Sequence, residues 1–118
     1  MSGNNGSFYP QWTASMQSMK TRVPEFGKSF GAMFQGLMKD GALSAREKEL
    51  IALAISLALR CETCIWSHVD KCLKLGATPE QILDAAGVAV VMQGGPSYTY
   101  VPKVIEAIDA LAPKAAQA

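Results

Sequence analysis

Four residues of this chain have the types and the spacing of a thiol redox site. They are Glu49, Cys61, Cys64 and His68, in the pattern E-x11-C-x-x-C-x3-H. Two cysteines three residues apart can close a disulfide within one turn of chain. A histidine four residues after the second cysteine lies one helical turn further along, on the same face. The pattern therefore combines a nucleophile, a resolving thiol, a base and a carboxylate that can orient the base.

The thiols of such a site must be activated before they can react. The thiolate is the nucleophile, and an ordinary cysteine pKa of about 8.5 leaves only a few per cent ionised at neutral pH. We expect a helix to begin near Cys61, where unpaired amides and the helix dipole stabilise a negative sulfur. His68 lies one turn beyond Cys64 and is placed to accept its proton. The residues alone leave open which cysteine reacts first, because thioredoxin-like proteins use the N-terminal member of the pair.

Glu49 lies twelve residues before Cys61, but a helical hairpin brings it to the histidine. If the helices before and after Arg60 run antiparallel, Glu49 comes level with about residues 68–72. The carboxylate can then fix the imidazole tautomer, as the third member of a catalytic triad does. The alternative is a solvated first-turn carboxylate that the helix dipole favours.

A zinc site is another use for these side chains. Cys64, His68 and Cys72 share one helical stripe, at i, i+4 and i+8. The rise from i to i+8 is about 12 Å and a Zn–S bond is about 2.3 Å, so Cys64 and Cys72 cannot bind one ion. A site of Cys61, Cys64 and His68 with a fourth ligand from elsewhere stays open. We predict no metal and no cofactor, and we interpret Cys72 as a small buried apolar residue.

The chain as a whole is expected to be all-α, a compact bundle of about six helices. Capping boxes at Ser44 and Thr78, Pro24 at a first helical position and the Gly94–Pro96 turn mark helix ends. The predicted helices span residues 11–22, 24–38, 44–59, 61–75, 81–92 and 98–111. Pro102 either starts the last helix or kinks it. We expect a disordered segment at 1–8, a single domain at 9–113 and a flexible tail at 114–118.

Composition limits the partners of this 118-residue chain. The formal net charge is +1, and no run of Lys or Arg suggests binding to nucleic acid. The apolar run Leu50–Leu59 is far shorter than the roughly 20 residues that span a bilayer, and the N-terminus lacks the pattern of a signal peptide. We therefore predict a cytoplasmic protein that binds neither nucleic acid nor membrane.

The run Leu50–Leu59 is apolar on nearly all sides, so it must be covered on every side. A small domain has few helices for this task, which favours a homo-oligomer over a central core helix in a monomer. Four further residues, Ile65, Trp66, Tyr98 and Tyr100, are either core or the lining of a substrate pocket, and core is the more common role of aromatic residues in such domains.

From Glu47 to Met92 the sequence resembles the carboxymuconolactone decarboxylase family, in particular its alkylhydroperoxidase D-like branch. The marks of this resemblance are Glu49, the apolar helix, the Cys61-Glu-Thr-Cys64 motif, His68 and the segment GATPEQILDA at 76–85. The resemblance implies an all-helical fold that assembles as trimers or as hexamers. One position departs from the pattern, because the residue before the second cysteine is commonly histidine and here is Thr63.

The resemblance also implies roles for the motif residues. Cys64 would be the peroxide-reactive or mixed-disulfide thiol, and Cys61 the proton donor and resolving partner. Glu49 and His68 would form the proton relay. Because Thr63 stands where histidine is common, this relay has one imidazole fewer than is common in the branch. Enzymes of this branch reduce hydroperoxides weakly by themselves and can pass electrons from a lipoylated protein to a peroxiredoxin. The lactone decarboxylases generally lack the paired cysteines, so the pair argues against decarboxylation.

These observations favour a thiol-disulfide oxidoreductase that reduces hydroperoxides. Its substrate would be a small hydroperoxide or a disulfide, and an external dithiol or a lipoylated protein would reduce it. One alternative is a decarboxylase or related lyase that uses Glu49 and His68 as acid and base. The other is a metal-binding or structural oligomer whose cysteines are ligands or core.

Overall fold

The computed structural model describes the backbone of residues 2–113 and the side chains of residues 10–113. The described residues form seven helices and no strand, and one of the helices, α6, is a single turn. In chain order the helices are α1 (Ser2–Arg22), α2 (Pro24–Met38), α3 (Ala45–Ala58), α4 (Glu62–Lys74), α5 (Pro79–Gln93), α6 (Gly95–Tyr98) and α7 (Val101–Leu111). The prediction of an all-α fold is confirmed, whereas the tail predicted at 114–118 lies outside the described residues.

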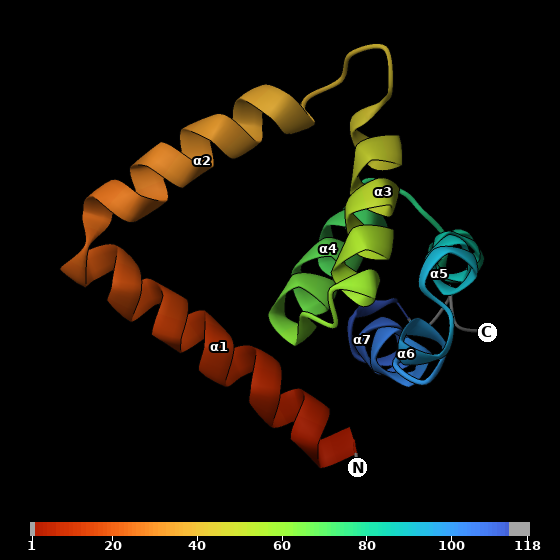
Figure 1. Cartoon of the computed structure of the whole chain (residues 1–118). Helices are drawn as coiled ribbons and strands as arrows, with labels where there is room; N and C mark the ends of the chain where they lie inside the picture. Colours follow the sequence, from red (N-terminus) through yellow and green to blue (C-terminus); the bar gives the residue numbers. More distant parts are fainter. Residues whose placement is uncertain (1, 114–118) are drawn as a thin grey trace. The chain divides into compact units, whose positions relative to one another are not determined.

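The chain divides into two compact units, residues 1–45 and 46–118, where the sequence predicts a single domain over 9–113. In the first unit α1 and α2 meet at Val23, whose backbone is not helical (Figure 1). Pro24 begins α2 and disfavours helical geometry at the residue before it, which explains the break. The helix α1 begins at Ser2, and the disorder expected over 1–8 stays a prediction.

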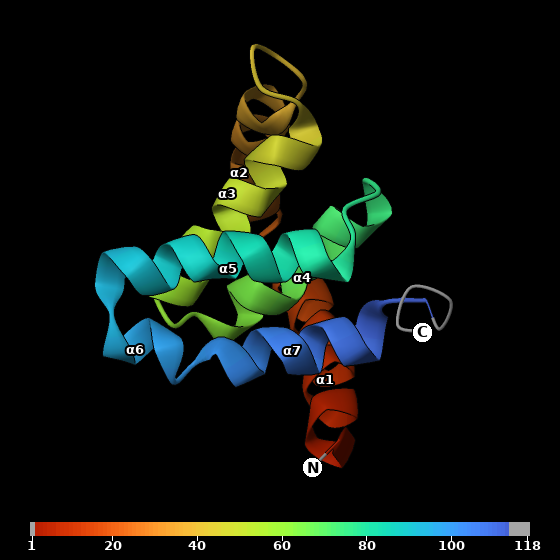
Figure 2. The ribbon, with the colours of Figure 1, turned by 90° about the vertical axis from the view of Figure 1, so that its right-hand side faces the viewer.

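The second unit holds the buried core. Figure 2 shows α5 and α7 side by side and joined at one end by α6, and α4 packs against α7. The largest fully buried apolar side chains come from α3, α4, α5 and α7, and include Leu53, Leu57, Ile65, Trp66, Val69, Ile82 and Val104. Three of them belong to α4, so the face of α4 that carries Ile65, Trp66 and Val69 is packed in the core.

The turn between α3 and α4 reverses the chain immediately before the cysteine motif. Arg60 has a positive φ of 55°, a left-handed conformation that costs about 1–2 kcal/mol for a non-glycine residue. The Cys61 amide donates to the Ser56 carbonyl at 3.1 Å, which closes the turn. The Arg60 guanidinium lies 5.2 Å from the centroid of the Tyr100 ring, a cation–π contact that ties the turn to the start of α7.

Several predicted helix ends are confirmed. Thr78 accepts from the Gln81 amide while the Gln81 side chain accepts from the Thr78 amide, which is the predicted capping box. Gly94 ends α5 with a positive φ of 84°. The last predicted helix, 98–111, is wrong at its start, because Tyr98 ends α6 and α7 begins only at Val101, with Pro102 in its first turn. None of the helices in residues 2–113 is both long and apolar enough to span a membrane.

Candidate active site

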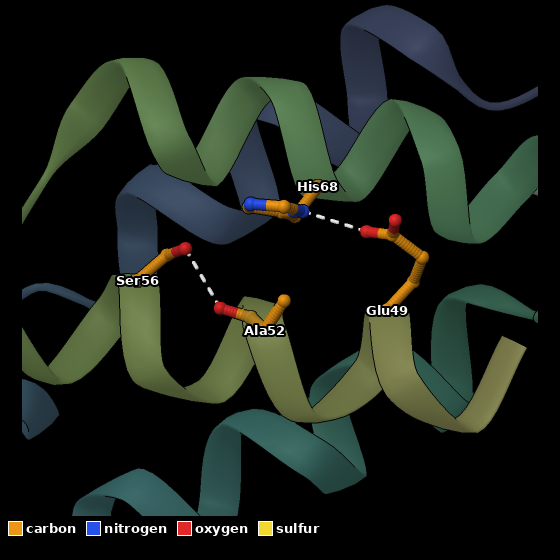
Figure 3. A network of polar contacts seen from close by, with 4 residues as sticks. All are labelled: Glu49, Ala52, Ser56 and His68. Atoms are coloured by element: carbon orange, nitrogen blue, oxygen red, sulfur yellow. Dashed lines mark hydrogen bonds and ion pairs between the residues drawn. The ribbon is translucent and has the colours of Figure 1, made fainter. Parts of the chain in front are cut away.

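The carboxylate of Glu49 and the imidazole of His68 form a hydrogen-bonded pair between α3 and α4. Glu49 Oε1 lies 2.6 Å from His68 Nδ1, and the two side chains point toward each other across the gap between the helices (Figure 3). Both side chains are shielded, with exposed fractions of 5% and 15% respectively. A carboxylate accepts hydrogen bonds when it is ionised, so this contact favours the tautomer in which Nδ1 donates to Glu49 and Nε2 carries the free lone pair.

The helical hairpin explains why residues nineteen apart meet. Glu49 lies in the second turn of α3 and His68 in the second turn of α4, on opposite sides of the turn at Arg60. Residues at similar distances from a reversal of the chain face each other when the two helices are antiparallel. The predicted position of Glu49, level with residues 68–72, is therefore confirmed.

Cys61 and Cys64 lie at the start of α4 and are joined by a disulfide, with their Cα atoms 5.3 Å apart. Cys61 is the N-cap residue, with extended backbone, and its Sγ accepts from the Cys64 amide at 3.3 Å. The Thr63 hydroxyl lies 3.5 Å from the same sulfur. The first turn of a helix has amides without intrahelical acceptors, so a sulfur at the N-cap meets donors and a positive partial charge.

Ser56 lies on the same buried side of α3 as Glu49. Seven residues apart, the two side chains lie on one side of the helix and are both buried (Figure 3). The Ser56 hydroxyl donates a hydrogen bond to the Ala52 carbonyl at 2.7 Å. The backbone carbonyl of Ser56 accepts a hydrogen bond from the Cys61 amide. Ser56 thus links the helix that holds the carboxylate to the first residue of the cysteine motif.

The sequence model of the carboxymuconolactone decarboxylase family matches residues 24–110, which is most of the chain and includes the whole site. The chain belongs to this family.

Two bacterial proteins are similar in sequence to this chain along nearly their whole length. A protein of Cupriavidus necator is 36% identical over 107 residues, covering 79% of this chain and 95% of that protein. A protein of Paracoccus denitrificans, protein 4 of the cox locus, is 33% identical over 100 residues. The match covers 85% of this chain and 90% of the Paracoccus protein.

Two crystal structures of carboxymuconolactone decarboxylase family proteins have the same fold. That of a Legionella pneumophila protein in its apo form has a TM-score of 0.86 at 34% identity, covering 93% of this chain and 98% of the other. That of a Thermotoga maritima protein has a TM-score of 0.73 at 26% identity, covering 86% of each chain. The Thermotoga protein is described as a possible participant in the antioxidative response.

The third cysteine of this family member is buried and is not part of the Cys61–Cys64 disulfide. Cys72 is a free thiol with no exposed surface, which confirms its interpretation as a small core residue. Burial, together with a smaller contribution from the nearby charge of Glu49, raises the pKa of Cys72 to about 12. Within residues 2–113 no three His, Cys, Asp or Glu side chains converge as metal ligands.

Cys72 should therefore resist alkylation in the folded protein. At about pH 8 a pKa of about 12 leaves roughly one thiol in ten thousand ionised, against about a quarter for an exposed cysteine. We expect iodoacetamide to label Cys61 and Cys64 of the reduced native protein, and to label Cys72 only in concentrated guanidinium chloride. Peptide mass spectrometry measures each site. Equal labelling of Cys72 in the native and unfolded protein would contradict this prediction.

Two contacts that hold the site were not predicted from the sequence. Glu62, inside the cysteine motif, pairs with Lys103 of α7 at 3.5 Å. Arg60 contacts Tyr100, as described above. Both contacts join the segment at the start of α4 to the segment at the start of α7, about forty residues away in sequence, and no spacing rule signals them. For Ser56 a signal existed, namely a serine seven residues after Glu49 in the otherwise apolar run Leu50–Leu59.

The four residues considered as either core or pocket lining have different surroundings. Ile65 and Trp66 are buried in the core of the second unit. Tyr98 is mostly exposed, and Tyr100 lies beneath the Arg60 guanidinium. The core interpretation therefore holds for Ile65 and Trp66.

Proposed function

We propose that the protein is a thiol-disulfide oxidoreductase of the alkylhydroperoxidase D-like type that reduces small hydroperoxides. The observation that carries the proposal is the 2.6 Å contact between Glu49 of α3 and His68 of α4. The Cys61–Cys64 disulfide lies at the start of the same helix as His68. A histidine whose Nδ1 is fixed by a carboxylate has a basic Nε2, which is the requirement for deprotonating a nucleophile. A dithiol that closes to a disulfide needs no further cofactor to store two electrons.

The first half of the proposed cycle oxidises Cys64. His68 takes the proton of the Cys64 thiol, and the thiolate attacks the terminal oxygen of the hydroperoxide. The O–O bond breaks, and Cys64 becomes a sulfenic acid. The alkoxide leaves as an alcohol after taking the proton of the Cys61 thiol. Glu49 stays ionised and stabilises the imidazolium that His68 forms during this step.

The second half closes and then reopens the disulfide. The Cys61 thiolate attacks the Cys64 sulfur, and hydroxide leaves as water with the proton held by His68. A dithiol then reduces the Cys61–Cys64 bond by two electrons and is itself oxidised to a disulfide. An external dithiol or a lipoylated protein fits this requirement, because its two sulfurs can attack in sequence. The site as proposed acts in the reducing environment of the cytoplasm.

The proposal includes assembly as a homo-oligomer, a trimer or a hexamer. Its support is an apolar groove of about 320 Å³ between α3 and α5, lined by residues that include Leu50, Ile55, Val88 and Met92. Ile55 is 54% exposed and Met92 80% exposed in the isolated chain. Apolar surface of this kind is covered in stable proteins, and a second copy of the chain provides matching surface.

The proposed reaction predicts a fixed stoichiometry. When the reduced protein meets one equivalent of cumene hydroperoxide, we expect one peroxide to be consumed per chain and two thiols to disappear. Thiol titration counts the loss, and peptide mass spectrometry should find the new bond between Cys61 and Cys64, with Cys72 still a free thiol. Peroxide that stays unconsumed while both thiols persist would overturn the proposal. That result would favour the alternative function, a lyase that uses Glu49 and His68 without the cysteines.

A further inference from the structure

The two sulfurs of the Cys61–Cys64 pair have different surroundings. The Sγ atom of Cys61 lies against two hydrogen-bond donors, the Cys64 amide at 3.3 Å and the Thr63 hydroxyl at 3.5 Å. Both donors belong to the first turn of α4, and Cys61 is its N-cap. The Cys61 sulfur therefore occupies the position at which a helix N-terminus stabilises negative charge.

A hydrogen bond from a hydroxyl or an amide to sulfur is weak while the sulfur is neutral. It becomes a charge-assisted bond when the sulfur carries a negative charge, and such bonds are about twice as strong. The donors around Cys61 thus favour its thiolate over both its thiol and its disulfide form. A lower thiol pKa also makes a sulfur the better leaving group when a disulfide is attacked.

We propose that Thr63 is a positioning residue for the reductive half of the cycle: its hydroxyl stabilises Cys61 as the leaving thiolate and so directs an incoming dithiol to the sulfur of Cys64. The inference rests on the proposed function to the extent that the pair must be reducible. The new element is the role of Thr63: its hydroxyl would direct the reductant, a dithiol with two neighbouring thiols, to the cysteine that the family resemblance implies as the mixed-disulfide thiol.

The proposed step balances as a thiol–disulfide exchange. One thiolate of the dithiol attacks Cys64 Sγ and forms a mixed disulfide, while the Cys61–Cys64 bond breaks and its electron pair stays on Cys61. The second thiolate of the dithiol then attacks the dithiol sulfur of that mixed disulfide and releases Cys64. The dithiol loses two electrons and two protons. The two cysteines gain them, with the Cys61 sulfur held as a thiolate by Thr63 until it is protonated.

Thr63 is suited to this role by its rigidity. A β-branched side chain has few χ1 rotamers in a helix, so the hydroxyl stays near the sulfur with little loss of entropy. Serine keeps the hydroxyl but loses the methyl group, whereas valine keeps the shape and loses the hydroxyl. The pair Thr63→Val and Thr63→Ser therefore separates the hydrogen bond from the packing of the side chain.

The first experiment measures Cys61 as a single thiol. In the full-length Cys64→Ala protein, the rate of iodoacetamide alkylation at Cys61 is followed against pH by peptide mass spectrometry. Adding Thr63→Val should move the midpoint of this profile up by about one pH unit, as expected for losing one hydrogen bond to a charged group. Adding Thr63→Ser should restore the midpoint to within a few tenths of a unit. An unchanged midpoint in Thr63→Val overturns the inference.

The second experiment finds the sulfur that is attacked. The oxidised protein with both cysteines is mixed with glutathione, quenched with N-ethylmaleimide and digested, and the glutathione adduct is mapped. We expect the adduct mainly on Cys64 in the wild type. In Thr63→Val we expect the share on Cys61 to rise and the rate of reduction by dithiothreitol to fall roughly fivefold. An adduct mainly on Cys61 in the wild type contradicts the proposed direction of attack.

The two proposals fail in different ways. The alkylation midpoint of Cys61 does not require any turnover, so it tests Thr63 even in a protein that reduces no peroxide. Loss of the peroxide stoichiometry with a normal effect of Thr63→Val would overturn the proposed function alone. A normal peroxide reaction with no effect of Thr63→Val on the midpoint or on the adduct would overturn the inference alone.

Discussion

Replacement of Cys64 by serine is expected to lower kcat/KM for hydroperoxide reduction by roughly 1,000-fold or more, because a serine hydroxyl is neither ionised near neutral pH nor oxidised by peroxide. The substitution changes a single atom of a partly buried side chain at the helix start. Its effect should therefore fall on the chemistry and leave the fold intact. A coupled assay with dithiothreitol and cumene hydroperoxide measures the rate, and thermal denaturation of the reduced proteins checks the fold.

Two further cysteine variants serve as controls for the Cys64→Ser result. Cys61→Ser keeps the proposed nucleophile and removes the resolving thiol, so we expect one rapid turnover, a sulfenic acid on Cys64 that dimedone traps, and a slow steady state. Cys72→Ala removes the third sulfur from the core and should retain most of the activity. Full peroxide reduction by Cys64→Ser would sink the assignment of the nucleophile. Activity on a lactone acid that survives Cys61→Ser and Cys64→Ser together would support the lyase.

The part of the site that could be predicted is the part that local geometry fixes. The His68 ring was expected one turn beyond Cys64, and the meeting of Glu49 with His68 followed from counting residues back from a turn near Arg60. Helix ends with capping boxes, or with Pro24 at the first position, were predicted within one or two residues. In each case the responsible interaction joins residues that are close in sequence or related by one reversal of the chain.

The part that could not be predicted depends on contacts between distant segments. The pairing of Glu62 with Lys103, and of Arg60 with Tyr100, follows from the packing of α4 against α7. Hydrophobic periodicity does not specify which two helices pack together, so no sequence pattern marks these partners. The division of the chain near residue 45 likewise depends on contacts that form only in the fold.

Thr63 shows a different limit of sequence reasoning. In the sequence it appears only as a departure from the histidine that is common in the resembling branch. The distance of 3.5 Å from its hydroxyl to Cys61 Sγ depends on the side-chain rotamer and on Cys61 being the N-cap. A pattern that predicts where a helix begins within a residue or two cannot say which sulfur receives a hydroxyl.

The second large effect is expected at the buried pair. Replacing His68 by alanine should lower kcat/KM roughly 100- to 1,000-fold, since proton transfer by a positioned base contributes about that much. It should also reduce the free energy of unfolding by about 1–3 kcal/mol, because Glu49 is left buried without its partner at 2.6 Å. Kinetics are therefore measured at a temperature at which circular dichroism finds the variant folded. Lys74→Ala, which breaks the exposed pair with Asp70 on the same helix, should change the unfolding free energy by less than about 1 kcal/mol.

A double-mutant cycle separates the role of Glu49 from that of its partner. If Glu49 acts by orienting His68, then Glu49→Gln should lower kcat/KM roughly tenfold or more in the wild type but change it little in the His68→Ala protein. The pH profile of kcat/KM should shift in Glu49→Gln, because a neutral amide does not stabilise the imidazolium as a carboxylate does. Additive effects of the two substitutions would mean that the carboxylate acts directly on the substrate. A lyase would require a carboxylate that acts on the substrate without His68, whereas a thiol peroxidase would not.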